Sequence, residues 1–327
     1  MVVVLTLFVA AGCTDTNSAT GTTGRPAPES NWSAPVLIVG RSLPADERSV
    51  YGVSCPSANF CLAVDESGSA HFWRNGRWAA PQPTGVTGTL TSISCPTTTD
   101  CVAVSFGGSA VTYRGDSWSV PSPVGPEATY QISCPTTDFC ATVGANGRAG
   151  AASTIATSHG PSWTAAQAPG RGTRNDRLMD VSCATADRCL AVNLDGRSLI
   201  FDGHRWSPVP MAVDGGLISI SCPSVSFCMA LSPSGRSVVF DGKRWSTPRS
   251  IPVGVLSLPR SVSCASRSVC VGIGLGGRAV VWRDDRWSQP VTVFPGGFSA
   301  SVGISCPTDD VCMAVDARGE AARWSPS

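Results

Sequence analysis

A Ser-Cys dipeptide followed, after five further residues, by a second cysteine occurs seven times in this chain of 327 residues. The first cysteines of successive copies lie 40, 39, 49, 39, 42 and 42 residues apart. Self-similarity at a period near 40 residues indicates an array in which one small structural unit is repeated. We therefore expect seven copies of one unit, each carrying one of the following pairs: Cys55/Cys61, Cys95/Cys101, Cys134/Cys140, Cys183/Cys189, Cys222/Cys228, Cys264/Cys270 and Cys306/Cys312.

Three further positions recur at fixed distances from these cysteines. A glycine follows the second cysteine by seven residues in every copy: Gly68, Gly108, Gly147, Gly196, Gly235, Gly277 and Gly319. An aromatic residue comes five positions later in six copies: Trp73, Tyr113, Phe201, Phe240, Trp282 and Trp324. A tryptophan follows after five more positions in five copies: Trp78, Trp118, Trp206, Trp245 and Trp287. The third copy has Ala152 at the aromatic position and delays its tryptophan to Trp163, which indicates an insertion within 151–172, either a functional graft or drift.

The local pattern within each copy predicts β-strands. Segments such as 217–221 and 237–240 are short, apolar and bounded by turn residues, and no stretch has a sustained helical period. Asn75-Gly76, Asp202-Gly203 and Asp241-Gly242 are typical of tight hairpin turns. The constant glycine is expected to take a positive φ between the second and third strands. Each copy is therefore expected to form four short antiparallel strands, a to d.

A four-stranded sheet of this size cannot bury both faces alone, but seven sheets arranged radially can. The sequence thus predicts an all-β, seven-bladed β-propeller of four-stranded antiparallel blades over residues 31–327, with the strand c and d aromatics packed between blades. In the last copy the strand d tryptophan would fall at position 329. Residues 31–35, which contain Trp32, are expected to supply that strand instead, although the tetrapeptide 323–326 also resembles the start of a strand d.

The cysteine spacing favours disulfides over a metal site. Zinc ligand pairs usually have two to four intervening residues, so we expect no metal and seven disulfides that join strands a and b of each copy. Such bonds persist in oxidising compartments. Cys13 is the one cysteine left over.

The N-terminus predicts export and lipidation. Residues 2–12 form an apolar run that is too short to span a bilayer as a helix and fits a signal peptide. Ala10, Ala11 and Gly12 before Cys13 resemble a bacterial lipobox, so we expect a lipoprotein signal peptide over 1–12, lipidation of Cys13 and a flexible tether over 13–30. The protein would then be anchored to the cell membrane outside the cytoplasm. The alternative is an ordinary secretory signal and a secreted protein.

Composition excludes other classes of protein. Net charge is +1 and only 14% of residues are charged, whereas a nucleic-acid binder needs a Lys/Arg surplus. Of the 24 basic residues only Lys243 is a lysine, which suggests the GC-rich codon usage of actinobacteria. We expect no cofactor and a monomer.

The repeat resembles bacterial secreted and lipoprotein β-propellers, including the bacterial neuraminidase repeat (Asp-box) propellers of actinobacteria. The segments 201–206 and 240–245 occupy the place of an Asp box between strands c and d, but they lack its Ser and Thr. The resemblance covers residues 31–327 and implies a sialidase-like option, in which a tyrosine nucleophile works with acidic partners and an arginine cluster.

Candidate functional residues are few, and we predict no catalytic residue. Arg148, Arg197, Arg236 and Arg278 follow the constant glycine, so they could form an anion- or glycan-binding rim, or they could be solvated turn arginines. Asp65 and Asp316 hold equivalent places in blades that ring closure makes neighbours. They could form a paired-carboxylate site, but turn-forming side chains explain them more simply.

The constant serine before each first cysteine is expected at the crowded axis, where it would line a ligand channel or, as we favour, serve packing. These serines are Ser54, Ser94, Ser133, Ser182, Ser221, Ser263 and Ser305. The histidines, His71, His159 and His204, fall at unrelated repeat positions.

Two functions follow. We favour a non-enzymatic binding or scaffold module for a protein or cell-wall glycan. The alternative is a sialidase-like carbohydrate-active hydrolase or lyase.

Overall fold

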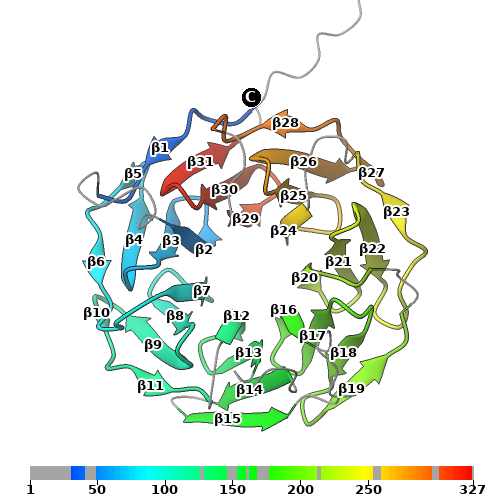
Figure 1. Cartoon of the computed structure of the whole chain (residues 1–327), viewed down its shortest axis with the longest axis horizontal. Helices are drawn as coiled ribbons and strands as arrows, with labels where there is room; N and C mark the ends of the chain where they lie inside the picture. The colour runs from blue at the N-terminus through cyan, green and yellow to red at the C-terminus, as the bar shows by residue number, and fades with distance from the viewer. Residues whose placement is uncertain are drawn as a thin grey trace, which may run out of the picture.

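The computed structural model describes residues 31–40, 49–125, 129–145, 153–159, 162–167, 177–211, 215–252, 259–296 and 302–325. Its strands form seven antiparallel sheets that surround a central axis (Figure 1). The seven-bladed propeller predicted from the repeats is confirmed. Within the described ranges there is no helix of sufficient length and apolar character to cross a lipid bilayer.

Each blade begins with its innermost strand a and proceeds outward. Blade 1 comprises β2 (Val50–Ser57), β3 (Phe60–Asp65), β4 (Ser69–Arg74), β5 (Arg77–Trp78) and β6 (Gln82–Pro83). Blade 2 comprises β7 (Leu90–Ser94), β8 (Asp100–Ser105), β9 (Ser109–Arg114), β10 (Ser117–Trp118) and β11 (Ser122–Pro123). Blade 3 comprises β12 (Thr129–Thr136), β13 (Phe139–Ala145), β14 (Ser153–His159) and β15 (Ser162–Gln167).

The remaining blades follow the same order. Blade 4 comprises β16 (Leu178–Thr185), β17 (Arg188–Asn193), β18 (Ser198–Phe201) and β19 (Trp206–Val209). Blade 5 comprises β20 (Ser219–Ser224), β21 (Phe227–Ser232), β22 (Arg236–Phe240) and β23 (Arg249–Ser250). Blade 6 comprises β24 (Pro259–Cys264), β25 (Cys270–Gly274), β26 (Arg278–Arg283), β27 (Arg286–Trp287) and β28 (Val291–Thr292). Blade 7 comprises β29 (Val302–Thr308), β30 (Val311–Asp316), β31 (Glu320–Trp324) and β1 (Val36–Leu37). In blades 1, 2 and 6 the outermost strand is broken into two pieces that both pair with strand c.

The N-terminal segment closes the ring as predicted. β1 pairs with β31, and Trp32 forms a β-bridge with Trp324 (Figure 1). Trp324 itself lies opposite Cys312, which is the strand c position in the other blades. The repeat spacing therefore assigned Trp324 to the correct strand, whereas the likeness of the tetrapeptide 323–326 to a strand d did not. Blade 7 contains both ends of the described chain, so it acts as a clasp.

The turns take the backbone conformations that their residues favour. The constant glycine has a positive φ in every copy where it is described, between 67° and 83°. A Cβ on Gly68 would collide with the carbonyl oxygen of Val86, so no other residue fits there. Asn75 and Gly76 both have positive φ, as the predicted hairpin turn between β4 and β5 requires.

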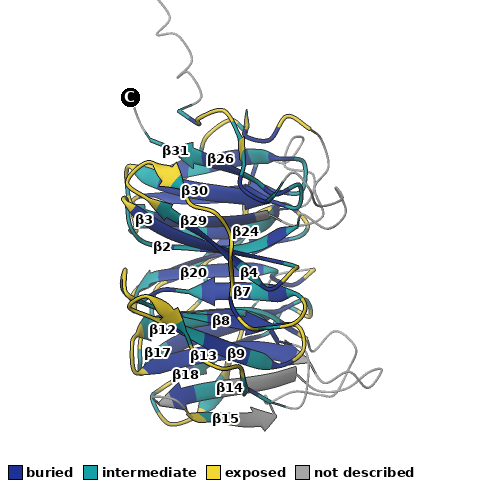
Figure 2. Ribbon diagram, turned by 90° about the vertical axis from the view of Figure 1, so that its left-hand side faces the viewer, coloured by how far each residue is buried: buried dark blue, intermediate teal, exposed yellow. Residues whose placement is uncertain are grey.

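The hydrophobic core lies between the blades. Figure 2 shows the buried residues concentrated in the strands, with exposed residues at the turns of both faces. Phe72 of blade 1 contacts Tyr113 of blade 2 with ring centroids 5.1 Å apart, and Phe139 stacks on Phe201 across blades 3 and 4 at 5.7 Å. Aromatic pairs of this kind stabilise beyond their buried area. The prediction that strand c aromatics pack between blades is confirmed.

All seven cysteine pairs form disulfides between strands a and b, in the predicted pairing: Cys55–Cys61, Cys95–Cys101, Cys134–Cys140, Cys183–Cys189, Cys222–Cys228, Cys264–Cys270 and Cys306–Cys312. This number of disulfides indicates an oxidising, extracytoplasmic environment.

The second cysteine of each pair is more deeply buried than the first. In the described structure the first cysteines are 5–8% exposed, whereas the second cysteines are only 0–3% exposed: Cys61, Cys101, Cys140, Cys189, Cys228, Cys270 and Cys312. The reason is their register on strand b, where each second cysteine except Cys140 lies opposite the strand c aromatic of its own blade. Solvent therefore has little access to these sulfurs.

The third copy corrects one detail of the repeat alignment. Residue 158 of β14, a serine, lies opposite Cys140, so Ser158 holds the place of the strand c aromatic and Ala152 does not. Trp163 then follows at the usual distance of five residues. The insertion therefore precedes strand c; Ala152 and much of 151–172 lie outside the described residues.

Candidate functional site

The constant serines form a ring of hydrogen bonds around the axis. Each serine hydroxyl accepts a hydrogen bond from the backbone N–H of the first cysteine in the following blade, at 2.9 Å in all seven cases. Ser54 accepts from Cys95, for example, and Ser305 accepts from Cys55 across the closure. This serine ring joins neighbouring blades, which agrees better with the packing hypothesis than with the ligand-channel hypothesis. The hydrogen bonds themselves are an addition to both hypotheses.

A cavity of about 700 Å³ lies on the axis beside the serine ring. It is lined by residues three and four positions before the first cysteine of successive blades, and it reaches Ser133 and Ser182. Because the start of strand a pairs with the end of strand b, the cavity opens on the face that carries the b–c turns. Its volume is typical of a ligand-binding site.

The residues four positions before the first cysteine differ in every neighbouring pair of blades. We call them the lining ring: Tyr51, Thr91, Tyr130, Met179, Ile218, Arg260 and Val302. The first six of these line the cavity. The serine ring is therefore constant in all copies of the repeat, whereas the lining ring beside it along the axis varies.

One side of the cavity is aromatic. Tyr51 and Tyr130 come from β2 and β12, and Phe106 comes from the b–c turn of blade 2. The rings of Phe106 and Tyr130 lie 6.2 Å apart, and Phe106 is 56% exposed. An exposed aromatic next to a cavity is a common feature of binding sites, since burying it on a ligand is favourable.

The opposite side carries the charges. Asp180 on β16 has an enclosed carboxylate that accepts hydrogen bonds from the N–H of Ile220 (2.9 Å), the hydroxyl of Ser219 (2.9 Å) and the N–H of its own neighbour Val181 (2.8 Å). Burial raises the pKa of Asp180 to about 6, while these hydrogen bonds and the charge of Arg260 act in the opposite direction.

Arg260 on β24 and Arg177, just before β16, are the cations of this cavity. Burial lowers the pKa of the Arg260 guanidinium, and the Asp180 carboxylate opposes that shift. Within the described residues neither arginine makes a hydrogen bond or an ion pair. Asp180 thus influences Arg260 through space but does not hold it.

The acidic groups of the cavity are few. Among the described residues that line the cavity, Asp180 is the only carboxylate, and its hydrogen bonds come from blade 5 and its own backbone rather than from a tyrosine. Sialidase-like hydrolysis uses a tyrosine nucleophile, and the family pattern gives that tyrosine an acidic partner and adds an acid/base carboxylate. No group of three metal-ligating side chains occurs in the described part of the chain.

The disulfide cysteines are structural and do not contribute to this cavity. Neither member of any pair lines it. The sulfurs of Cys61, Cys101, Cys189 and Cys228 lie in side chains that are at most 1% exposed, inside the layers between blades. These disulfides hold strands a and b together, and the buried sulfurs are not accessible to a ligand or a redox partner.

The predicted arginine rim lies apart from the cavity. Arg236 and Arg278 begin β22 and β26, and Arg197 directly precedes β18, so all three sit at b–c turns on the face where the cavity opens. None of them lines the cavity. Arg148 and Cys13 lie outside the described residues, so the full rim and the lipidation stay predictions.

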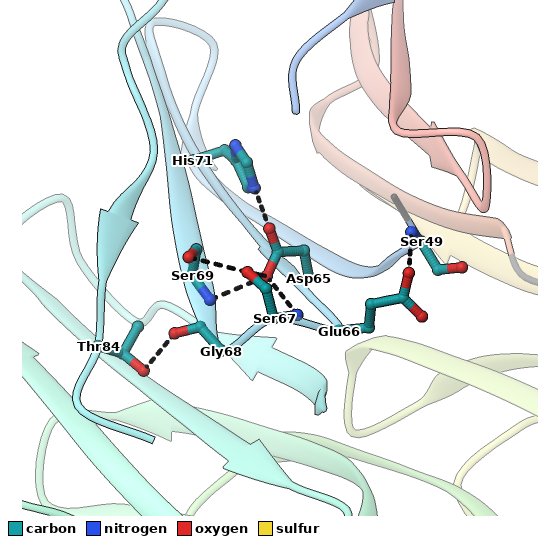
Figure 3. Close-up of polar contacts among 8 residues, drawn as sticks. All are labelled: Ser49, Asp65, Glu66, Ser67, Gly68, Ser69, His71 and Thr84. Carbon is teal, nitrogen blue, oxygen red and sulfur yellow. Dashed lines mark hydrogen bonds and ion pairs between the residues drawn. The ribbon is translucent and has the colours of Figure 1, made fainter. Parts of the chain in front are cut away.

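Asp65 and Asp316 are turn-forming residues, as the simpler hypothesis held. Asp65 Oδ1 accepts hydrogen bonds from the N–H of Ser67 and Ser69 at 2.9 and 2.8 Å, as Figure 3 shows. Asp316 Oδ1 accepts from the backbone of Arg318 and Glu320 in the same way, and Oδ2 forms an ion pair with Arg318 at 2.9 Å. Each carboxylate is thus saturated within its own blade.

Asp65 has a further partner in His71, which is fully buried on β4. His71 Nε2 lies 2.8 Å from Asp65 Oδ2 (Figure 3). Burial acts to raise the pKa of Asp65, but the hydrogen bond from His71, with those from Ser69 and Ser67, holds it below its usual value. The Ser67 hydroxyl bonds to Asp65 and not to the imidazole, so these residues do not form a nucleophilic triad.

Sequence reasoning missed the cavity residues. No role was predicted for Phe106, Asp180 or Arg260, because the repeat pattern shows only the positions that the copies share. Alignment of the seven copies on their first cysteine, followed by a search for the position that varies most, would have found the lining ring.

Comparison with known proteins adds the fold alone. No protein-family model and no curated protein sequence matches the chain. Among solved structures it is similar to one described as "YCF48 bound to D1 peptide", with a TM-score of 0.68 and 14% sequence identity. The match covers 92% of this chain and 99% of the other, so the two proteins share the propeller over nearly their full lengths.

Proposed function

We propose that this protein is a non-enzymatic binding module, lipid-anchored through Cys13 outside the cytoplasmic membrane, which takes a peptide segment of a protein partner into its axial cavity. The observation that carries the proposal is the lining ring, where residues differ between blades on an otherwise constant scaffold. Positions that vary in a regular array serve recognition better than they serve the fold. The neighbour of the same fold that was solved with a peptide supports a polypeptide as the ligand.

Site-specific photo-crosslinking in the full chain tests this proposal. p-Benzoylphenylalanine replaces Phe106 at the cavity mouth or, as a matched control on the outside of the same blade, Val120, which is 84% exposed. We expect a discrete polypeptide adduct from position 106 and none from position 120. Equal labelling from both positions, or no polypeptide adduct from position 106, would contradict peptide binding in the cavity.

The anchor is tested separately. Cys13→Ser should release the protein from the membrane fraction or block its processing. Unchanged fractionation together with unchanged processing would exclude lipidation at Cys13. A glycosidase screen on the full chain tests the hydrolase alternative, and turnover that one acidic substitution abolishes would replace the binding proposal.

A further inference from the structure

The cation of Arg260 is placed in the cavity without a partner of its own. It lies on β24, it is more than half enclosed, and no described residue accepts a hydrogen bond from it or forms an ion pair with it. Some side-chain nitrogens of the described structure are fully buried and lack a hydrogen-bond partner, but none of them belongs to Arg260. The guanidinium of Arg260 therefore faces the cavity. A partly buried guanidinium is stabilised when it gains a hydrogen-bonding anion.

The nearby carboxylate makes no hydrogen bond or ion pair with Arg260. Asp180 uses its oxygens to accept from Ile220, Ser219 and Val181, which fix it to blades 4 and 5. With Arg177 at the mouth, the charged side of the cavity carries two cations and one anion when Asp180 is ionised. The net field therefore favours an anionic ligand group.

On these grounds, and resting on the proposed function, we propose that Arg260, assisted by Arg177, binds a carboxylate of the peptide ligand, while Tyr51, Phe106 and Tyr130 pack against a neighbouring apolar or aromatic part of it. The carboxylate is a Glu or Asp side chain or the C-terminus, since both offer the same planar acceptor to a guanidinium.

The groups around Asp180 give this recognition a pH dependence. The groups that line the cavity around Asp180 are Arg260 from β24, Ser219 from β20 and the uncharged Tyr130 and Gln131 from β12, with Arg177 preceding its own strand. As the pH falls through about 6 the carboxylate gains a proton. The cavity then changes from a net charge of +1 to +2, while a peptide carboxylate with an ordinary pKa near 4 stays ionised. Binding should tighten several-fold between pH 7.5 and 5.5.

Peptides selected on the full chain provide the test. Heptapeptides are selected from a random library with free C-termini, and the dissociation constant of the best one is measured for the wild type, Arg260→Gln and Arg286→Gln. Arg286 is a matched control, because it is an exposed arginine of the same blade that lies outside both the cavity and the predicted rim. Each peptide is also made with Gln or Asn for its acid and, separately, with an amidated C-terminus, which distinguishes the two sources of the carboxylate.

We expect Arg260→Gln and removal of one carboxylate each to weaken binding by about 10-fold or more. The two changes together should cost no more than either alone, and Arg286→Gln should have no effect. Arg260→Lys, which keeps the charge, should restore part of the loss. Equal unfolding temperatures would show that the Arg260 variants are folded.

Other outcomes separate this inference from the proposed function. Selected peptides that crosslink through position 106 but bind equally well without a carboxylate, or equally well to Arg260→Gln, would overturn carboxylate recognition and leave peptide binding intact. Failure of any peptide to bind, with Arg260-dependent binding of polygalacturonate instead, would overturn both in favour of an anionic glycan.

Discussion

The serine ring and the lining ring lie on or next to the same seven inner strands, three residues apart, and they have opposite characters. The serine ring is identical in every blade, and each hydroxyl accepts one inter-blade hydrogen bond at 2.9 Å. The lining ring offers phenol, hydroxyl, thioether, aliphatic and guanidinium groups to one cavity. The serine ring closes the propeller, and the lining ring beside it is where we propose that the ligand binds.

Asp180 lies between these two classes. Along its strand, it lies one residue closer to the ring serine than the lining-ring residue does. Its carboxylate accepts a hydrogen bond from the N–H of Ile220 in the next blade, as a ring serine would. Ser92 and Ser219 make equivalent inter-blade contacts to Ile132 and Val262 at 3.4 and 3.1 Å. The scaffold therefore extends partway into the cavity wall, with one ionisable group in it.

The largest effect on stability should come from a deletion that opens the closed propeller, because both the serine ring and the lining ring depend on its closure. Deleting residues 14–35 removes Trp32, the bridge to Trp324 and the hydrogen bond from Ser33 N–H to Arg323. Loss of one buried tryptophan costs about 3–5 kcal/mol in protein cores, so the free energy of unfolding should fall by at least that amount in urea titrations. Trp32→Ala alone should cost less.

Deleting only residues 14–28 is the control for this truncation, and it should leave the unfolding free energy unchanged. Equal stability of the two deletions would show that the N-terminal segment does not hold the ring closed.

The next effect concerns Asp180 and depends on pH. Its folded pKa of about 6 lies above the unfolded value, so the folded state binds the extra proton between about pH 4 and 6. Stability from this group is complete below pH 4 and is lost as the pH rises through 6, by up to roughly 3 kcal/mol. Relative to Asp180→Asn, the wild type should therefore lose stability between pH 4 and 7 in denaturant titrations. A difference between the two proteins that does not change with pH would refute the buried titration.

A smaller loss is expected from a single break in the serine ring. Ser221→Ala leaves the N–H of Cys264 without its acceptor, which should cost about 1–3 kcal/mol and lower the Tm. Ser224→Ala on the same strand is the matched control, because its hydroxyl makes only a 3.5 Å contact with Ser226. Indistinguishable Tm values for the two variants would mean that the serine ring contributes no more than its volume.

The smallest effect should come from the lining ring. Tyr51→Phe removes a hydroxyl that makes no hydrogen bond within the described residues, so the Tm should change by less than the equivalent of about 0.5 kcal/mol. Differential scanning calorimetry beside Ser221→Ala compares the two rings directly. A loss as large as that of Ser221→Ala would remove the distinction between scaffold and lining.

The sequence by itself determined the architecture of this protein. Seven cysteine pairs, a constant glycine and regularly spaced aromatics impose the same local structure in every copy, because disulfide spacing, positive φ and strand alternation act over a few residues. The clasp also followed from counting, since Trp32 was the one tryptophan that matched a strand d without belonging to a copy. The insertion in the third copy was misplaced, because spacing alone does not show on which side of a strand extra residues lie.

Only the tertiary structure decided which side chains meet at the axis. Tyr51, Asp180 and Arg260 are separated by more than 70 residues along the chain, and they come together because the blades are arranged radially around one cavity. The partners of Asp180 and the unpaired state of Arg260 depend on distances between blades, which no repeat pattern encodes. Local chemistry specified each blade, and closure of the ring assembled the site from the positions at which the blades differ.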